Sequence, residues 1–321
     1  YFGNYPGLMN KAAGELSFRP FPKSERAFLE SLARVDWPGN PKTVARAWSY
    51  FREGYSQFPI ALSFTWFGPL HCSIVWPLHL EPVDQPIAPS WTFGWPDSGD
   101  RIGECIGFEH SLDEVLRLLK GMDENWQKGL ALLAPLEAEL GKNRDRQRDL
   151  GLYRAIGLQI RSAYNVFRFY ELRERLPFCR PVRQREMLAL MAGLVREERA
   201  GSRAMKRLCL RDPRLGFHSE AEGYKFFPAK LERRVRRLNR LLAREFPQVA
   251  SDIRARRPLF AAYSGLAPEG KRYDLVAGAA MAEPAPFEVG KGSWKAWRRG
   301  RQITFEIEWA PSGAADDRII V

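Results

Sequence analysis

Apolar residues recur at helical spacing through the middle of the chain. Ser111 opens this stretch, and Glu114 follows three residues later, which is the pattern of a capping box at a helix start. Apolar residues then follow with the spacing of one helix face: Leu112, Val115, Leu116, Leu119, Met122 and Trp126. The pattern predicts helices over residues 111–140, 144–176, 183–211 and 228–246, broken by Pro177, Pro181 and Pro213. Helices with such short connections predict an antiparallel bundle over residues 108–258.

The first hundred residues have a different pattern. Helical spacing predicts short helices over residues 8–18, 24–35 and 41–57. Between and after them come apolar, aromatic runs, and residues 59–67 and 73–80 are typical of buried strands. Residues 82–103 then form a loop rich in proline and glycine. Long loops in compact domains are usually functional or disordered, and this one carries two tryptophans.

The last part of the chain alternates apolar and polar residues in the manner of strands. Residues 302–309 show this alternation, residues 311–313 form a turn, and residues 317–321 begin a further strand. We therefore expect a linker over residues 259–284 and the start of an all-β domain over residues 285–321. Because the chain starts at Tyr1 inside a motif and stops at Val321 inside a strand, we expect it to be an internal part of a longer protein.

Charge is distributed unevenly. The chain of 321 residues has a net charge of +12. Residues 142–258 hold 30 basic and 13 acidic residues, a net of +17, whereas residues 1–141 hold 12 and 17, a net of −5. A helical arginine face can bind phosphates, be solvated, or pair with the acidic segment. Because no nucleic-acid-binding motif accompanies the arginines, we expect no nucleic acid as partner.

Metal, disulfide and membrane chemistry find little support in the sequence. The four cysteines show no CxxC spacing, which argues against a structural zinc site or a disulfide framework and slightly favours a reducing compartment. His71 and His79 lack a third ligand at metal spacing. No run of about 18 apolar residues is present, so no membrane helix is expected. We expect no cofactor and no metal.

Aromatic residues are concentrated in the N-terminal region. Six of the ten tryptophans lie between Trp37 and Trp95. Flat rings stack on the apolar faces of sugars, while polar neighbours bind the hydroxyls. The rings placed at strand ends or in the loop are the candidates for such stacking: Trp66, Trp76, Trp91 and Trp95. The alternative is that these rings fill a core or a domain interface.

Polar side chains lie among these rings. A glycosidase needs two carboxyl groups across the scissile bond, and Glu81, at the end of the second apolar run, is the best catalytic candidate. Asp97 and Asp100 flank Ser98-Gly99 and are equally well explained as turn formers. His71 and Arg101 would contact substrate, and the guanidinium of Arg101 suits a sugar carboxylate because it binds carboxylates bidentately.

The connection over residues 212–228 is also rich in polar and aromatic residues. Ser219 and Glu222 have capping-box spacing, which is a structural explanation that needs no ligand. His218 and Glu220 remain available to a binding surface. The pattern leaves both roles open.

Several short motifs together resemble those of bacterial glycoside-hydrolase-like proteins similar to α-glucuronidases and β-hexosaminidases. The motifs are Asn4-Tyr5-Pro6 with residues 8–13, Gly68-Pro69 with His71, Trp76-Pro77, Pro89-Ser90-Trp91 and residues 216–223. Residues 294–321 are similar to the opening of family 9 carbohydrate-binding modules. The resemblance implies the C-terminal portion of a (β/α)8 barrel over residues 1–107, a helical bundle over 108–258, and a truncated β-sandwich over 285–321.

The resemblance and the residues imply a carbohydrate-active protein that hydrolyses the glycosidic bonds of an oligosaccharide, with oligosaccharides that bear uronic acid among the candidates. Its partner would be that oligosaccharide or polysaccharide, and most of a barrel would be missing, so this chain alone would be inactive. One alternative is a carbohydrate-binding protein without catalysis, on a degenerate barrel. Another is a helical protein that binds phosphate or nucleic acid through residues 142–258.

Overall fold

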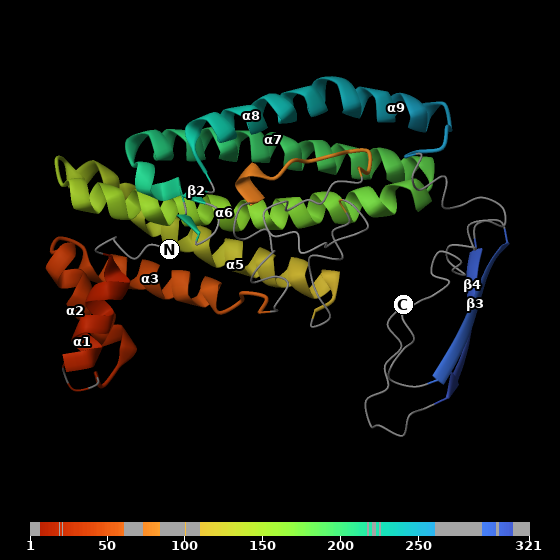
Figure 1. Ribbon diagram of the computed structural model, residues 1–321. Coiled ribbons are helices and arrows are strands. Elements are labelled where there is room, and N and C mark those ends of the chain that lie inside the picture. The colour runs from red at the N-terminus through yellow and green to blue at the C-terminus, as the bar shows by residue number, and fades with distance from the viewer. Residues whose placement is uncertain are drawn as a thin grey trace. The chain divides into compact units, whose positions relative to one another are not determined.

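The computed structural model describes residues 7–18, 20, 22–60, 73–83, 100, 110–216 and 226–260, and the backbone of residues 218–219, 223–224, 291–299 and 302–310. The chain divides into two compact units, residues 1–250 and residues 251–321. Figure 1 shows the first unit as a stack of long helices.

The first unit is built by helices that each pack on the next one along the chain. After α1 (Leu8–Phe18) and α2 (Glu25–Asp36), α3 (Pro41–Tyr55) packs on α5 (Leu112–Leu133), α5 on α6 (Arg144–Arg175), α6 on α7 (Pro181–Arg211), and α7 on α8 (Pro228–Arg240). Figure 1 shows α7 lying between α6 and α8. Short 3-10 segments join several of them: η5 (Ala134–Leu140), η6 (Leu176–Phe178) and η7 (Pro213–Gly216). The helices predicted over residues 8–18, 24–35, 41–57, 144–176 and 183–211 are confirmed to within two residues at their ends. The helix predicted over residues 111–140 ends as an α-helix at Leu133, and the one predicted over 228–246 continues to Arg254.

Local sequence explains where these helices begin. Ser111 accepts a hydrogen bond from the backbone N–H of Glu114, and the Glu114 side chain accepts one from the backbone of Ser111, so the predicted capping box is present. Asn143 caps α6 through the N–H of Arg146. Pro181 stands in the first turn of α7, where a missing N–H costs nothing. The α7 helix therefore begins at the proline that the sequence pattern treated as a break.

One core lies where α2, α3 and α5 meet the first half of α6. Trp37, Trp48 and Trp126 are buried in it, as are Phe51 and Tyr153. Phe51 stacks on Trp126 with ring centroids 4.4 Å apart, and the indole N–H of Trp48 donates to the hydroxyl of Tyr153 at 3.0 Å. The indole N–H of Trp126 donates to the carbonyl of Tyr153 at 2.9 Å, so two of the three tryptophans satisfy their polar atom, as buried tryptophans usually do, whereas the indole nitrogen of Trp37 has no hydrogen-bond partner among the described residues.

The crossing of α3 and α5 depends on glycine. A Cβ at Gly54 would stand 2.9 Å from the carbonyl oxygen of Met122, a backbone atom that cannot move aside without shifting α5. We expect Gly54→Ala to lower the free energy of unfolding by about 1–3 kcal/mol, the usual cost of overpacking. Gly193→Ala is the matched control, because a Cβ there meets nothing within 4 Å and the change should stabilise α7 by about 0.5–1 kcal/mol. Urea unfolding of both variants measures this, and equal effects at the two sites would contradict it.

Helix α6 is the centre of the unit. It packs with α5, α7 and η2 (Ser73–Val75), and its buried side chains therefore lie around most of its circumference. Several of them are polar: Arg146, Asp149, Gln159, Ser162, Asn165, Glu171 and Arg173. Buried polar groups must find hydrogen-bond partners, so α6 organises much of the polar interior.

The uneven charge distribution has a structural counterpart along α6. Its arginines pair with acids from the segment before residue 142, as in Arg146 with Asp36 at 2.9 Å and Arg161 with Asp123 at 2.5 Å. Arg154 pairs with Glu137 at 2.6 Å. Of the three roles that the charge pattern left open for the arginines, pairing with the acidic segment is therefore present where the N-terminal helices share this core. Exposed pairs contribute about 0–1 kcal/mol each, so the apolar core stabilises the packing of these helices more than these pairs do.

Asp149 gives this interface a pH dependence. Burial raises the pKa of Asp149 to about 6, although Arg146 lies 3.1 Å away. The folded state therefore holds a proton between pH 4 and 6 that the unfolded chain releases, and the penalty for the ionised carboxylate is fully present above pH 6. We expect Asp149→Asn to gain up to about 3 kcal/mol of unfolding free energy relative to the parent between pH 4 and pH 7. Asp145→Asn, at an exposed position, should show no such gain, and parallel stability curves for Asp149→Asn and the parent would contradict the assignment.

The expected barrel portion over residues 1–107 is wrong. In the described residues no parallel strands are present, and residues 73–80, predicted as a strand, form η2 followed by an extended segment without strand partners. Residues 59–60 are not in a strand, and residues 61–67 of that predicted strand lie outside the described residues. Apart from residues 76–83, the connections between helices and two short strands in the connection before α8, the described part of the first unit is helical. An apolar run of this length fits a buried strand or a buried single segment equally well, and only the tertiary surroundings decide between them.

The connection before α8 forms a small hairpin in place of the expected helix start. Strands β1 (His218–Ser219) and β2 (Gly223–Tyr224) pair antiparallel, and α8 begins at Pro228, after Phe227. The capping box predicted at Ser219 is therefore wrong. Beyond α8, the π-helical turn η8 (Leu241–Glu245) leads directly into α9 (Phe246–Arg254).

The second unit contains one antiparallel hairpin among its described residues. Strand β3 (Lys291–Arg299) pairs with β4 (Gln302–Ala310), and Trp294 stands opposite Ile307. The predicted strand over residues 302–309 is confirmed. The expected β-sandwich is not present in the described part of the chain, because a sandwich needs a second sheet to pack on this one.

Candidate functional site

Residues 73–83, which begin with η2 and continue as an extended segment, pack against α6, α7 and α8, and we name them the strap. Its apolar side chains are buried: Ile74, Trp76, Leu78 and Leu80 are each at most 2% exposed. Among the described residues no strand pairs with the backbone of the strap. Burial of an unpaired carbonyl costs free energy, so the strap requires donors from elsewhere.

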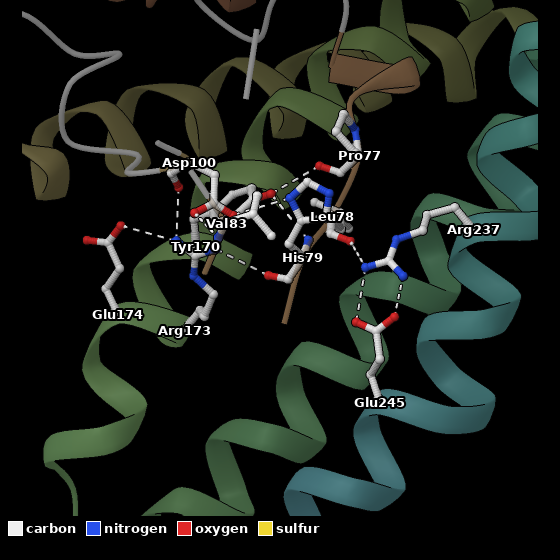
Figure 2. Close-up of polar contacts among 10 residues, drawn as sticks. All are labelled: Pro77, Leu78, His79, Val83, Asp100, Tyr170, Arg173, Glu174, Arg237 and Glu245. Atoms are coloured by element: carbon white, nitrogen blue, oxygen red, sulfur yellow. Dashed lines mark hydrogen bonds and ion pairs between the residues drawn. The ribbon is translucent and has the colours of Figure 1, made fainter. Parts of the chain in front are cut away.

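Side chains of the helices supply those donors, one strap carbonyl after another. Arg234 of α8 donates to the carbonyl of Trp76 at 2.8 Å, and Arg237 donates to that of Leu78 at 3.1 Å. Tyr170 of α6 donates through its hydroxyl to the carbonyl of Pro77 at 3.0 Å. Figure 2 shows Tyr170 beside Pro77 and Arg237 reaching the carbonyl of Leu78. The helices therefore bind the strap much as a neighbouring strand would.

A buried ionic cluster lies at the end of the strap. Arg173 and Asp100 are both 0% exposed, and the guanidinium donates to a carboxylate oxygen of Asp100 at 2.5 Å and to its backbone carbonyl at 2.9 Å. Arg173 also reaches the carbonyl of His79 at 3.3 Å and lies over the ring of Tyr170. The ring Nδ1 of His79 is 3.3 Å from the same carboxylate oxygen of Asp100. Figure 2 shows Asp100 and Arg173 facing one another beside His79.

The cluster keeps Asp100 ionised. Burial alone would raise the pKa of Asp100, but hydrogen bonds from His79 and the charge of Arg173 hold it below its ordinary value. The opposite holds for Tyr170, whose pKa burial raises. At neutral pH the site thus contains a fixed carboxylate and an un-ionised phenol. This arrangement can hold backbone and charge in place.

Asp100 also closes a loop. Its backbone N–H donates to the carbonyl of Val83 at 3.0 Å, and its side chain accepts from the N–H of Val83 at 3.1 Å. We name this pair of hydrogen bonds the clamp. It joins the two ends of residues 84–99, the proline-rich segment that carries Trp91 and Trp95. Because Asp100 pairs with Arg173, the residues on either side of that segment, Val83 and Asp100, are connected to α6.

A second buried network fixes the other end of the strap. Glu198 of α7 and Arg234 of α8 are each 2% exposed at their side chains and pair at 2.7 Å. The carboxylate also accepts from Ser162 at 2.5 Å and Asn165 at 2.9 Å. Arg234 donates further to Ser202 at 2.9 Å. Both charges are thus surrounded by partners, which a buried ion pair requires.

The described candidates for sugar contact do not gather into one site. Trp76 is 2% exposed and lies among the helices, so its ring packs the core and offers no free face to a sugar. Glu81, the catalytic candidate, is exposed on the strap. His218 lies in β1, of which the backbone alone is described. The remaining candidates fall outside the described residues, and their roles stay predictions: Trp66, His71, Trp91, Trp95, Arg101 and Glu220.

The sequence patterns missed the groups that matter most in the structure. The sequence leaves Asp100 open between a polar group among the aromatic rings and a turn former. Arg234 and Arg237 belong to an arginine-rich helix for which phosphate binding, solvation and pairing with the acidic segment all stay open. His79 likewise appears in the sequence only as a polar group among the rings that lacks metal-ligand spacing. A signal existed for Arg173, because it stands in a helix among apolar residues, but its partner is 73 residues away in the sequence.

Metal and membrane features add nothing further. Among the described residues no group of three or more His, Cys, Asp or Glu side chains is arranged to hold a metal ion. In the same residues no helix is long and apolar enough to cross a membrane. Cys179 and Cys209 are free, and burial raises the pKa of the Cys209 thiol to about 11.

Comparisons with known proteins assign no relative. No family model matches the chain, and neither the curated proteins nor the solved structures contain a match.

Proposed function

We propose that this chain belongs to a carbohydrate-active protein and binds an oligosaccharide through residues 84–99. The observation that carries the proposal is the clamp between Val83 and Asp100, which fastens both ends of this segment to one buried point. Fixing the ends of a loop lowers the entropy lost when the loop orders around a ligand. Trp91 and Trp95 supply the flat rings that sugar binding uses.

The composition of the segment supports a sugar over an apolar ligand. Asp84 and Asp97 accompany the two tryptophans, and Arg101 follows Asp100 directly. Carboxylates accept hydrogen bonds from sugar hydroxyls, and a guanidinium pairs bidentately with a uronic-acid carboxylate. We therefore expect tighter binding of acidic oligosaccharides than of neutral ones.

The proposal is limited to binding. Hydrolysis of a glycosidic bond needs two carboxyl groups at a defined separation across the bond. The chain supplies one catalytic candidate, Glu81, which is exposed on the strap. Because the barrel that would present a second carboxyl group is absent from the described residues, binding is the activity to test first.

Calorimetric titration with a panel of neutral and uronic-acid oligosaccharides tests the proposal. We expect saturable binding of at least one acidic member. The double variant Trp91→Ala/Trp95→Ala should weaken it at least tenfold while the thermal midpoint stays the same. Phe178→Ala is the matched control, because this aromatic ring is 65% exposed on η6. Failure of every oligosaccharide to bind, or equal binding by the double variant, would overturn the proposal.

A further inference from the structure

A groove runs along α7 on the side where η8 and α9 lie, and we name it the α7 groove. Figure 1 shows α7 and the continuous α8–α9 rod side by side. The groove has a volume of about 540 Å³. Ten residues line it: Arg185, Leu188, Ala189, Ala192, Arg196, Arg199, Leu242, Phe246, Pro247 and Ala250. None of these residues is used by the strap, the clamp or the buried networks.

The floor of the groove is apolar. Leu188 and Phe246 are buried, while Ala192, Leu242 and Ala250 are half-buried and still reachable. Small side chains on both walls let another backbone approach closely. Apolar surface left in a groove between two helices is the setting in which a third helix packs.

The rim of the groove is basic. Arg185 and Arg196 are exposed, and neither forms an ion pair with a described residue. Arg199 is half-buried and donates to the side-chain oxygen of Asn239 at 3.1 Å. The residues that line the groove include no carboxylate to neutralise these charges. The rim is therefore complementary to an acidic partner.

The backbone of one wall departs from a regular helix. Leu242 lies in the π-helical turn η8, next to the ion pair between Arg237 and Glu245 that spans the turn. Such turns add one residue to a helical turn and are frequently found at functional sites. Here the turn lies between Arg240 and Phe246 and shapes the wall of the groove.

We propose that the α7 groove binds an acidic amphipathic helix of a partner protein. The apolar side of that helix would cover Leu188, Leu242 and Phe246, and its carboxylates would meet Arg185 and Arg196. These two arginines are 11 residues apart, which is about 17 Å along α7, so a helix of about four turns reaches both. A nucleic-acid backbone would match the arginines and leave the apolar floor without a counterpart. The proposal is independent of oligosaccharide binding.

The test uses a fluorescein-labelled 18-residue peptide with leucines on one helical face and glutamates flanking them. Fluorescence anisotropy with the full chain should show saturable binding. The variant Arg185→Glu/Arg196→Glu should weaken it at least tenfold, as should Ala192→Trp, which fills the floor. The control Arg144→Glu/Arg207→Glu changes two exposed arginines outside the groove by the same total charge and should stay within twofold. Circular dichroism confirms that each variant is folded.

Several results would overturn the proposal. A scrambled peptide of equal composition that binds as well as the amphipathic one would show attraction by charge alone. Equal losses of peptide affinity in Arg185→Glu/Arg196→Glu and in the control Arg144→Glu/Arg207→Glu would also show that charge alone attracts the peptide. Absence of peptide binding would overturn the proposal too. If the chain instead self-associated in sedimentation, or bound a DNA duplex, and Arg185→Glu/Arg196→Glu abolished that association, the occupant of the groove would be a second copy of the chain or a nucleic acid.

Discussion

Replacing Glu198 by Gln should lower the free energy of unfolding by about 3–5 kcal/mol, because it breaks a buried ion pair by removing one partner. The carboxylate faces Arg234 at 2.7 Å with both side chains 2% exposed. Removing its charge leaves the guanidinium buried and uncompensated. Urea unfolding followed by circular dichroism measures the loss.

The neighbouring residue provides the control. Glu197 is exposed, and its carboxylate accepts a long hydrogen bond of 3.3 Å from the side-chain amide of Asn165. Glu197→Gln removes the same charge from the same helix, and we expect a change within about 0.5 kcal/mol. Equal costs for Glu197→Gln and Glu198→Gln would show that the buried network does not determine stability here.

Replacing Asp100 by Asn should cost about as much, again about 3–5 kcal/mol, because it leaves the buried Arg173 with the more distant and partly exposed Glu174, 3.7 Å away, in place of its buried countercharge. The pKa of Asp100 lies below its ordinary value, so its contribution is present at neutral pH and is lost as the pH falls below about 4. The loss caused by Asp100→Asn should therefore shrink in acid. A loss that is constant from pH 7 to pH 3 would contradict the assignment.

The double variant Asp100→Asn/Arg173→Met separates the charge from the packing. It removes both ions, and buried pairs replaced by neutral groups often lose little stability. Some loss remains, since Arg173 also serves the carbonyls of His79 and Asp100. We expect the double variant to be more stable than Asp100→Asn alone. If the loss of unfolding free energy in the double variant equals the sum of the losses in Asp100→Asn and Arg173→Met, Asp100 and Arg173 do not act as a pair.

The helices of this fold could be predicted from sequence because the information is local. The predicted range 144–176 differs from α6 by one residue at its end, and the capping box at Ser111 fixed the start of α5. Apolar spacing and caps act over a few residues, so no tertiary knowledge was needed. The same reasoning placed the strand at residues 302–309.

The strap could not be predicted in the same way. Its apolar run fits a buried strand, and nothing within residues 73–83 reveals that its carbonyls are bonded by Arg234 and Arg237, more than 150 residues further along the chain. Trp76 was expected at a sugar site on the strength of its neighbours, but the helices bury it. An arginine-rich helix likewise has the same pattern whether its guanidiniums face solvent or, as at Arg234, the interior.

The central claim is that the clamp holds an oligosaccharide-binding segment, and Val83→Pro tests it most directly. Proline removes the N–H that donates to Asp100 at 3.1 Å and leaves the Asp100–Arg173 pair in place. Val83→Ala keeps the N–H and is the control. In titration with the tightest-binding oligosaccharide, we predict at least a tenfold loss of affinity for Val83→Pro, unchanged helical circular dichroism, and a loss within twofold for Val83→Ala. Equal affinity of Val83→Pro and the parent would contradict the claim.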